Sequence, residues 1–256
     1  MKLSREQIEK YLGRIGMTMP EKIIPDSQLL SEIQYAHSTT VPYENLDILR
    51  GVPISLRPED LYEKIVENGR GGYCFELNGL LGVLLENLGY EVTDCFARYL
   101  RGESQIPMRR HRVLKVKAID GVFTCDAGTG EACPRTPLRL IEGLVQNSCG
   151  EQYRYSREPG LGWLLMDHIH GEWKPFYSFE EFCVLPVDFT AANFYCQYSE
   201  DSPFNKKEMF SLKTKDGRIT LDGDIFKRIR DEKVIQCIEY DKEHIAEAYA
   251  QFGIRY

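Results

Sequence analysis

This sequence lacks an excess of positive charge. The formal net charge is −7, with 32 lysines and arginines against 39 aspartates and glutamates. Proteins that bind nucleic acid gain most of their affinity by neutralising phosphates with basic side chains, and this chain has neither a basic domain nor a lysine-rich tail. We therefore expect no nucleic acid among its partners.

Long apolar runs are also missing. No window approaches the roughly 20 apolar residues that a membrane-spanning helix needs. The N-terminal stretch, MKLSREQIEKYLGRIG, is charged throughout and lacks the apolar segment of a signal peptide. We expect a cytoplasmic protein with no membrane partner.

Close pairs of cysteines are absent as well, although the chain has eight cysteines. No two of them have the spacing of a zinc knuckle or of a redox Cys-x-x-Cys motif, so we predict no metal site. In a reducing compartment the default role of each is that of a small buried hydrophobic residue. The eight are Cys74, Cys95, Cys125, Cys133, Cys149, Cys183, Cys196 and Cys237.

The spacing of apolar residues changes along the 256 residues. Before Gly89 it is helical, with a capping-box pattern at Ser4 and Gln7, N-cap candidates at Asp26 and Ser27, and a leucine stripe that starts near Cys74. After Gly89 it has a period of two, which predicts an antiparallel sheet or a small barrel with strands at 91–100, 112–119, 122–126, 162–170 and 173–179. The last third mixes both patterns, with helices at 188–198 and 241–251 and strands at 208–214 and 218–221.

One cysteine has a sequence context of its own. The stretch RGGYCFELNGLL, residues 70–81, places Cys74 in the first turn of a predicted helix, directly after a glycine pair and a tyrosine. Free backbone N–H groups and the helix dipole favour a thiolate there, so we expect an acidic thiol with open space above the sulfur. The alternative is that Cys74 only packs the end of its helix, and the local sequence leaves both open.

A nucleophilic thiol needs an imidazole to accept its proton and a third group to orient that imidazole. Of the five histidines, His111 leads a predicted strand, and Asp126 lies on the returning arm of a hairpin that turns at Asp120-Gly121. This register sets Asp126 opposite Lys115, on the same face as His111, and we expect that face to point away from the core of the sheet. An ideal ladder leaves the two side chains about 13 Å apart, so a bulge, a longer turn or strand twist must close the gap.

These residues together resemble the arylamine N-acetyltransferase family. The resemblance rests on Arg70-Gly71-Gly72-Tyr73-Cys74-Phe75-Glu76 with Asn78, then His111, then Asp126-Ala127-Gly128-Thr129-Gly130. The segments 41–47, 202–204 and 216–218 are similar to its secondary signatures. The cysteine block is highly specific, whereas the two C-terminal segments would be weak alone.

The resemblance implies an α+β multidomain fold with a cysteine-protease-like Cys-His-Asp arrangement. Its parts would be an N-terminal helical bundle at 1–89 carrying the cysteine, an antiparallel β-barrel at 90–187 carrying the histidine and aspartate, and a C-terminal α/β lid at 188–256. The pattern of helical, strand and mixed regions follows the same order.

The resemblance also implies ping-pong acetyl transfer with acetyl-CoA as co-substrate and no metal. Cys74 would take the acetyl group, His111 would move the proton, Asp126 would orient His111, and an arylamine, an arylhydrazine or a related amine would then attack the thioester. The substrate-binding residues implied are Tyr43, Tyr73, Gly128, Thr129 and Gly130. Thr129 stands where the family usually has an aromatic residue, so we expect a wider or more polar acceptor pocket than a simple arylamine needs.

Other interpretations remain at this point. A Cys-His-Asp hydrolase or transglutaminase uses the same residue types, and a degenerate homologue could bind CoA without turnover. His168 and His170 alternate on a predicted strand as metal ligands might, although an ordinary strand face explains them with fewer assumptions. The basic residues Arg98, Arg101, Arg109, Arg110 and Arg112 could meet CoA phosphates or could lie at a solvated strand edge.

Overall fold

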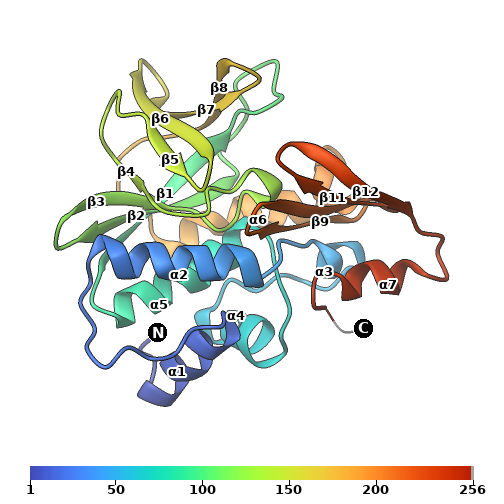
Figure 1. Cartoon of the computed structure of the whole chain (residues 1–256), viewed down its shortest axis with the longest axis horizontal. Coiled ribbons are helices and arrows are strands. Elements are labelled where there is room, and N and C mark those ends of the chain that lie inside the picture. The colour runs from blue at the N-terminus through green and yellow to red at the C-terminus, as the bar shows by residue number, and fades with distance from the viewer. Residues whose placement is uncertain (255–256) are drawn as a thin grey trace.

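The computed structural model describes residues 1–254, and Figure 1 shows three groups of elements: helices below, a strongly curved sheet above them and a smaller sheet to one side. The helices account for most of the N-terminal third, as predicted. They are α1 (Arg5–Arg14), α2 (Ser27–Thr40), α3 (Leu46–Leu49), α4 (Pro58–Tyr62), which a π-helical turn (Glu63–Glu67) continues, and α5 (Cys74–Asn87).

Local sequence sets the ends of these helices. The Ser4 hydroxyl accepts a hydrogen bond from the Gln7 N–H at 3.2 Å, and the Gln7 side chain accepts one from the Ser4 N–H at 2.9 Å, which completes the predicted capping box. Asp26 caps α2 by accepting from the Leu29 N–H at 2.9 Å. Gly89 follows α5 with a φ of +94°, a conformation that glycine adopts without a side-chain clash.

The larger sheet is antiparallel and nearly closes into a barrel, which confirms the predicted architecture. Within the described residues its strand order is β4-β3-β2-β1-β8-β7-β6-β5. Gln146 joins the two edge strands, since its Oε1 accepts from the Arg139 N–H at 2.6 Å and its Nε2 donates to the Arg139 carbonyl at 2.9 Å. The strands are β1 (Glu91–Tyr99), β2 (His111–Ala118), β3 (Gly121–Cys125), β4 (Leu138–Arg139), β5 (Gln146–Ser148), β6 (Glu151–Glu158), β7 (Gly162–Ile169) and β8 (Glu172–Phe179).

The β2–β3 hairpin turns one residue earlier than predicted. Its turn is Ile119-Asp120 rather than Asp120-Gly121, so Lys115 does not pair with Asp126. Continued beyond β3, the observed register brings Asp126 two residues closer to His111, which halves the predicted separation of about 13 Å. Because the pairing shifts by an even number of residues, the two side chains stay on one face.

Both faces of β2 are covered, so the prediction that His111 and Asp126 point away from the core of the sheet is wrong. Leu114 packs into the core that the helices form, whereas Val113 packs inside the barrel. The His111 ring follows the Val113 side and lies 5.6 Å from the ring of Tyr177, a barrel-core residue. The helices cover the opposite face of the sheet, on which Leu114 lies. The alternation of apolar and polar residues predicted that this face alone was buried.

The C-terminal part contributes a helix beside the site and a second sheet. Helix α6 (Phe189–Tyr198) shares a buried cluster with Cys74. The second sheet has the order β12-β11-β10-β9 within the described residues and packs against α7. Its elements are β9 (Met209–Thr214), β10 (Gly217–Asp222), β11 (Ile225–Arg230), β12 (Lys233–Glu239) and α7 (Ile245–Ala250); short 3₁₀ turns occur at Gly130–Ala132, Pro186–Asp188 and Pro203–Asn205.

The sequence predicted α6, β9, β10 and α7 but missed β4, β5, β6, β11 and β12. In β12 most side chains are exposed, so the strand has no alternation of apolar and polar residues to detect. The division at 89/90 and 187/188 stays a prediction, and residues 255 and 256 of the predicted lid lie outside the described residues.

Candidate active site

A cavity of about 610 Å³ lies between the start of α5, the barrel and the second sheet. Cys74 and His111 both line it. The loop that follows β3 contributes Gly128, Thr129, Gly130 and Glu131 to the wall, and β9 to β12 contribute much of the remainder. Segments that lie far apart in the sequence therefore enclose one space.

Cys74 is the first residue of α5 and is 4% exposed. Its Sγ lies 3.8 Å from the carbonyl oxygen of Arg110, the residue before β2. Glu76 completes the helix start by accepting the Tyr73 N–H at 3.1 Å. Gly128 crosses directly over this turn, because a Cβ at that position would lie 2.7 Å from the Cys74 Cα. The aspartate loop and the start of the helix are thus in contact.

His111 and Asp126 form a buried hydrogen-bonded pair. The distance between His111 Nε2 and Asp126 Oδ2 is 2.8 Å, and both residues are at most 3% exposed. The other oxygen of Asp126 accepts the Asn78 side-chain N–H at 2.9 Å and the Gly128 N–H at 2.8 Å. Asp126 is therefore fixed from both sides, and its bond to Nε2 leaves Nδ1 as the ring nitrogen that can accept a proton.

Asn78 ties α5 to β2 and to the loop that follows β3. Its Nδ2 also donates to the Arg112 carbonyl at 2.5 Å, and its Oδ1 accepts the Ala127 N–H at 2.8 Å. The sequence marked Asn78 only as part of a motif. Its role as a connection could not be inferred, because the partners lie more than thirty positions away, at separations of 34 and 49 residues.

The electrostatic setting of Cys74 differs from the prediction. Burial raises the pKa of the Cys74 thiol well above its ordinary value, and the nearby Cys196 and the charge of Asp126 act in the same direction. Backbone hydrogen bonds at Arg112 and Phe75 oppose this rise only in part. The helix start alone does not make this thiol acidic, so forming a thiolate requires a base that accepts its proton.

A buried ion cluster supports the start of α5, and we call it the helix-start cluster. Lys64 Nζ lies 2.7 Å from carboxylate oxygens of both Asp47 and Glu76. Arg70 Nη2 lies 2.6 Å from Glu44 Oε1 and 3.0 Å from Asp47 Oδ1. The cluster joins the 41–47 segment to the segment that precedes Cys74, and its carboxylates outnumber its cations.

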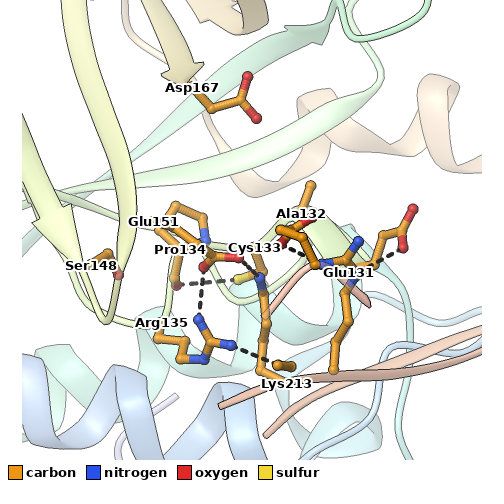
Figure 2. Close-up of polar contacts among 12 residues, drawn as sticks. Glu131, Ala132, Cys133, Pro134, Arg135, Ser148, Glu151, Asp167 and Lys213 are labelled. Carbon is orange, nitrogen blue, oxygen red and sulfur yellow. Dashed lines mark hydrogen bonds and ion pairs between the residues drawn. The ribbon is translucent and has the colours of Figure 1, made fainter. Parts of the chain in front are cut away.

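A second buried ion cluster joins the barrel to the second sheet, and we call it the lid cluster. Figure 2 shows Arg135, Glu151 and Lys213 converging beside Cys133. Glu151 Oε1 lies 2.7 Å from Lys213 Nζ, and Glu151 Oε2 lies 2.8 Å from Arg135 Nη1. The Cys133 thiol in turn donates to the Asp126 carbonyl at 2.7 Å, so this cluster adjoins the loop that carries the aspartate.

The structure brings most of the predicted substrate-binding residues to the cavity. Tyr43, Gly128, Thr129 and Gly130 line it. Tyr73 is not among the lining residues, because its ring is fully buried and its hydroxyl donates to Asn193 of α6. Sequence reasoning missed lining residues that only tertiary packing supplies, among them Tyr99, Phe210 and Ser211.

The structure also places the other candidate residues, which are two histidines and a group of arginines. His168 is on β7, but His170 lies in the following turn with a φ of +52°, so the two do not share a strand face. Among residues 1–254 no group of three or more histidine, cysteine, aspartate or glutamate side chains could hold a metal ion. Four of the five clustered arginines form ion pairs: Arg101, Arg109, Arg110 and Arg112 with Asp167, Glu180, Glu103 and Asp94 respectively.

A thiol and a carboxylate-bound imidazole on the wall of one cavity are typical of enzymes that attack a carbonyl carbon with sulfur. The sequence matches the family model described as N-acetyltransferase over residues 26–255. The arylamine N-acetyltransferase of Mycolicibacterium smegmatis is 36% identical over 219 residues, which cover 83% of this chain and 78% of that protein. The chain belongs to the arylamine N-acetyltransferase family and is an acyltransferase.

Solved structures agree with this assignment. The arylamine N-acetyltransferase from Salmonella typhimurium has a TM-score of 0.91 and 28% identity, with 99% of this chain and 92% of that chain covered. The Mycobacterium marinum arylamine N-acetyltransferase in complex with CoA has a TM-score of 0.89 and 30% identity, with coverage of 96% and 92%. No helix within the described residues is long and apolar enough to cross a membrane.

Proposed function

We propose that this acetyltransferase uses acetyl-CoA as donor and passes the acetyl group through Cys74 to an arylamine, an arylhydrazine or a related amine. The observation that carries the proposal is the 2.8 Å hydrogen bond between His111 and Asp126 on a cavity that Cys74 also lines. The CoA complex of the M. marinum relative supports the choice of donor.

In the first half-reaction the thiol of Cys74 loses its proton to His111 Nδ1. The thiolate attacks the carbonyl carbon of acetyl-CoA, the C–S bond to CoA breaks, and the CoA sulfur takes the proton from the imidazolium. Because one thioester replaces another, the step is nearly neutral in free energy. Asp126 stabilises the imidazolium and holds its ring, since it accepts the hydrogen bond from Nε2.

In the second half-reaction the amine nitrogen attacks the acetyl-Cys74 carbonyl. His111 accepts the proton that the nitrogen loses as the N–C bond forms. The Cys74 sulfur leaves, recovers that proton from the imidazolium and returns to the thiol. Because burial raises the pKa of Cys74, the sulfur depends on His111 to accept its proton in the first half-reaction and to return it in the second.

Intact-protein mass spectrometry after brief exposure to acetyl-CoA tests the proposal. We expect one acetyl group on the wild type, none on Cys74→Ala, and one on the matched control Cys196→Ala, whose thiol lies in the same buried cluster. A folded wild-type protein that gains no acetyl group would rule out the acetyl-cysteine pathway. Peptide substrates that acylate Cys74 instead would favour the hydrolase or transglutaminase interpretation.

A further inference from the structure

Cys133 closes the loop that follows the candidate aspartate. Its thiol donates a hydrogen bond to the backbone carbonyl of Asp126 at 2.7 Å, although the two residues are 7 positions apart in the chain. Gly128, Thr129 and Gly130, which line the cavity, lie within the loop that this contact closes. The contact therefore reaches Asp126 at its backbone, whereas His111 meets its carboxylate.

Three parts of the fold hold the segment that carries Cys133. The next residue, Pro134, accepts the side-chain N–H of Gln34 from α2 at 2.8 Å. Arg135 then pairs with Glu151 of β6 and donates to two backbone carbonyls of the second sheet. The segment is thus fixed by contacts that do not involve Asp126, and the thiol is a donor at a fixed place.

The surroundings of Cys133 favour the protonated thiol. The residue is 3% exposed, and burial raises the pKa of the thiol, with the charge of Asp126 acting in the same direction. The charge of Lys213 opposes this rise without reversing it. A thiol can donate a hydrogen bond, whereas a thiolate can only accept one. The sulfur is therefore suited to act as a donor to the carbonyl.

Asp126 is held at two places by different regions of the molecule. Asn78 of α5 donates to the carboxylate at 2.9 Å, and Cys133 donates to the carbonyl. Losing the second donor leaves a buried carbonyl with one partner fewer, which favours a shift of the backbone towards another donor. Such a shift would move the carboxylate away from the imidazole of His111, to which it now bonds at 2.8 Å.

We propose that Cys133 is a positioning residue for acetyl transfer, because its thiol holds the backbone of Asp126 where the carboxylate reaches His111. Cys133 does not line the cavity, so it acts through Asp126 and not on a substrate. This inference rests on the proposed function, in which Asp126 orients the imidazole.

The first readout is the rate at which acetyl-CoA acetylates Cys74, followed by intact-protein mass spectrometry at increasing acetyl-CoA concentrations. We expect Cys133→Ala to lower the saturating rate by about 10- to 100-fold, since a misplacement of about 1 Å can slow a reaction by that factor. The half-saturating concentration should stay near the wild-type value, because the residues that line the cavity are unchanged. Cys133→Ser keeps a donor and should recover most of the rate. Equal losses in the two variants would overturn the inference.

Cys95 provides a matched control. It is buried in the barrel core, and its sulfur lies 4.0 Å from the carbonyl oxygen of Thr93 in its own strand, β1. Cys95→Ala removes the same atom from a buried site whose contact is with β1 and not with Asp126. We expect the wild-type rate of acetylation in this variant. A loss as large as that of Cys133→Ala would show that the rate follows core packing, and the inference would be wrong.

A double-mutant cycle with Asp126→Asn tests whether Cys133 acts through the aspartate. Asp126→Asn removes the charged group that Cys133 is proposed to position. Adding Cys133→Ala to it should therefore slow the remaining reaction by less than about 3-fold, because residues that act as a unit have non-additive effects. If Cys133→Ala slowed both backgrounds by the same factor, its effect would not pass through Asp126 and the inference would fail.

Alkylation of Cys74 by iodoacetamide, followed on the peptide that contains Cys74, requires no acetyl-CoA. If wild-type Cys74 is never acetylated, the proposed function itself fails, and the alkylation rates of the same variants decide whether Cys133 acts on the thiol through Asp126. If wild type and Cys133→Ala are acetylated at equal rates, the proposed function stands and the inference alone is overturned.

Discussion

The two buried ion clusters hold opposite sides of the candidate site, and they carry opposite excess charge. The helix-start cluster has three carboxylates, those of Glu44, Asp47 and Glu76, for its two cations. The lid cluster has one carboxylate, that of Glu151, for Arg135 and Lys213. Each cluster therefore contains a buried charge that ion pairing alone does not neutralise.

Neighbouring groups compensate the excess charge of the two clusters in different ways. In the helix-start cluster burial raises the pKa of Glu76, with Lys64 opposing the rise, and backbone N–H groups of Leu46 and Tyr73 donate to the carboxylates. In the lid cluster burial lowers the pKa of Lys213. The guanidinium of Arg135 donates in addition to two backbone carbonyls of the second sheet, Thr214 at 2.9 Å and Gly217 at 2.6 Å.

The two clusters depend on different parts of the fold. The helix-start cluster lies within the N-terminal helices and places the thiol. The lid cluster spans the barrel and the second sheet, so it can form only once both are in place. We infer that removing a carboxylate lowers the stability of the protein more in the lid cluster than in the helix-start cluster. In the lid cluster the only carboxylate is lost and two cations stay unpaired, whereas in the helix-start cluster each cation keeps a carboxylate partner.

The largest effect is expected for Glu151→Gln in the lid cluster. Lys213 and Arg135 have side chains 1% and 3% exposed, so the variant leaves two buried positive charges without a counter-charge. We expect the free energy of unfolding to fall by about 3 kcal/mol, measured by chemical denaturation. Lys213→Met should cost less, because Arg135 and Glu151 then remain as a matched pair.

The control for this prediction is Glu91→Gln, which breaks an exposed ion pair with Lys117 whose side chains are 70% and 62% exposed. Such pairs contribute little, so we expect a change below about 0.5 kcal/mol. If Glu151→Gln changed stability no more than Glu91→Gln does, the charge imbalance assigned to the lid cluster would be wrong.

The imidazole of His37 is a third buried group that can be compared with the two ion clusters. His37 of α2 is fully buried, and neither ring nitrogen has a hydrogen-bond partner within the described residues. Burial lowers its pKa to about 3, and the charge of Arg14 acts in the same direction. The unfolded chain binds a proton at an ordinary pKa near 6.5, so His37 removes stability as the pH falls from about 6.5 towards 3.

At pH 5 this loss amounts to about 2 kcal/mol relative to pH 7. Denaturation curves at the two pH values should show that His37→Leu reduces the wild-type difference by this amount. His168→Gln, a matched histidine replacement on β7, should keep the wild-type difference. An undiminished pH dependence in His37→Leu would show that His37 is not the group responsible.

The two clusters also differ in how far sequence could predict them. Apart from Lys64, the residues of the helix-start cluster lie in the segments around Tyr43 and Cys74 that resemble family signatures. The sequence therefore indicated that these segments matter, but it did not reveal their ion pairs. No pattern connected Glu151 with Lys213, which are 62 residues apart, because β6 itself was not predicted. Pairing across separate sheets depends on tertiary packing, which has no local periodicity.

The candidate triad shows the same limit at shorter range. Strand alternation placed His111 and Asp126 on one face, but the gap between them depended on a turn that the Asp-Gly pair misplaced by one residue. The helix-start context of Cys74 was identified, whereas the burial that raises the pKa of its thiol was not. Local sequence reveals the dipole of a helix, whereas desolvation depends on everything packed around the sulfur.

The smallest effect is expected for Asp47→Asn in the helix-start cluster. Asp47 contacts both Lys64 and Arg70, but after its charge is removed Lys64 keeps Glu76 and Arg70 keeps Glu44. The variant therefore leaves equal numbers of buried positive and negative charges, and we expect unfolding free energy to fall by about 1 kcal/mol. A loss as large as that of Glu151→Gln would show that the number of contacts, and not the sign of the excess charge, decides how each cluster stabilises its side of the site.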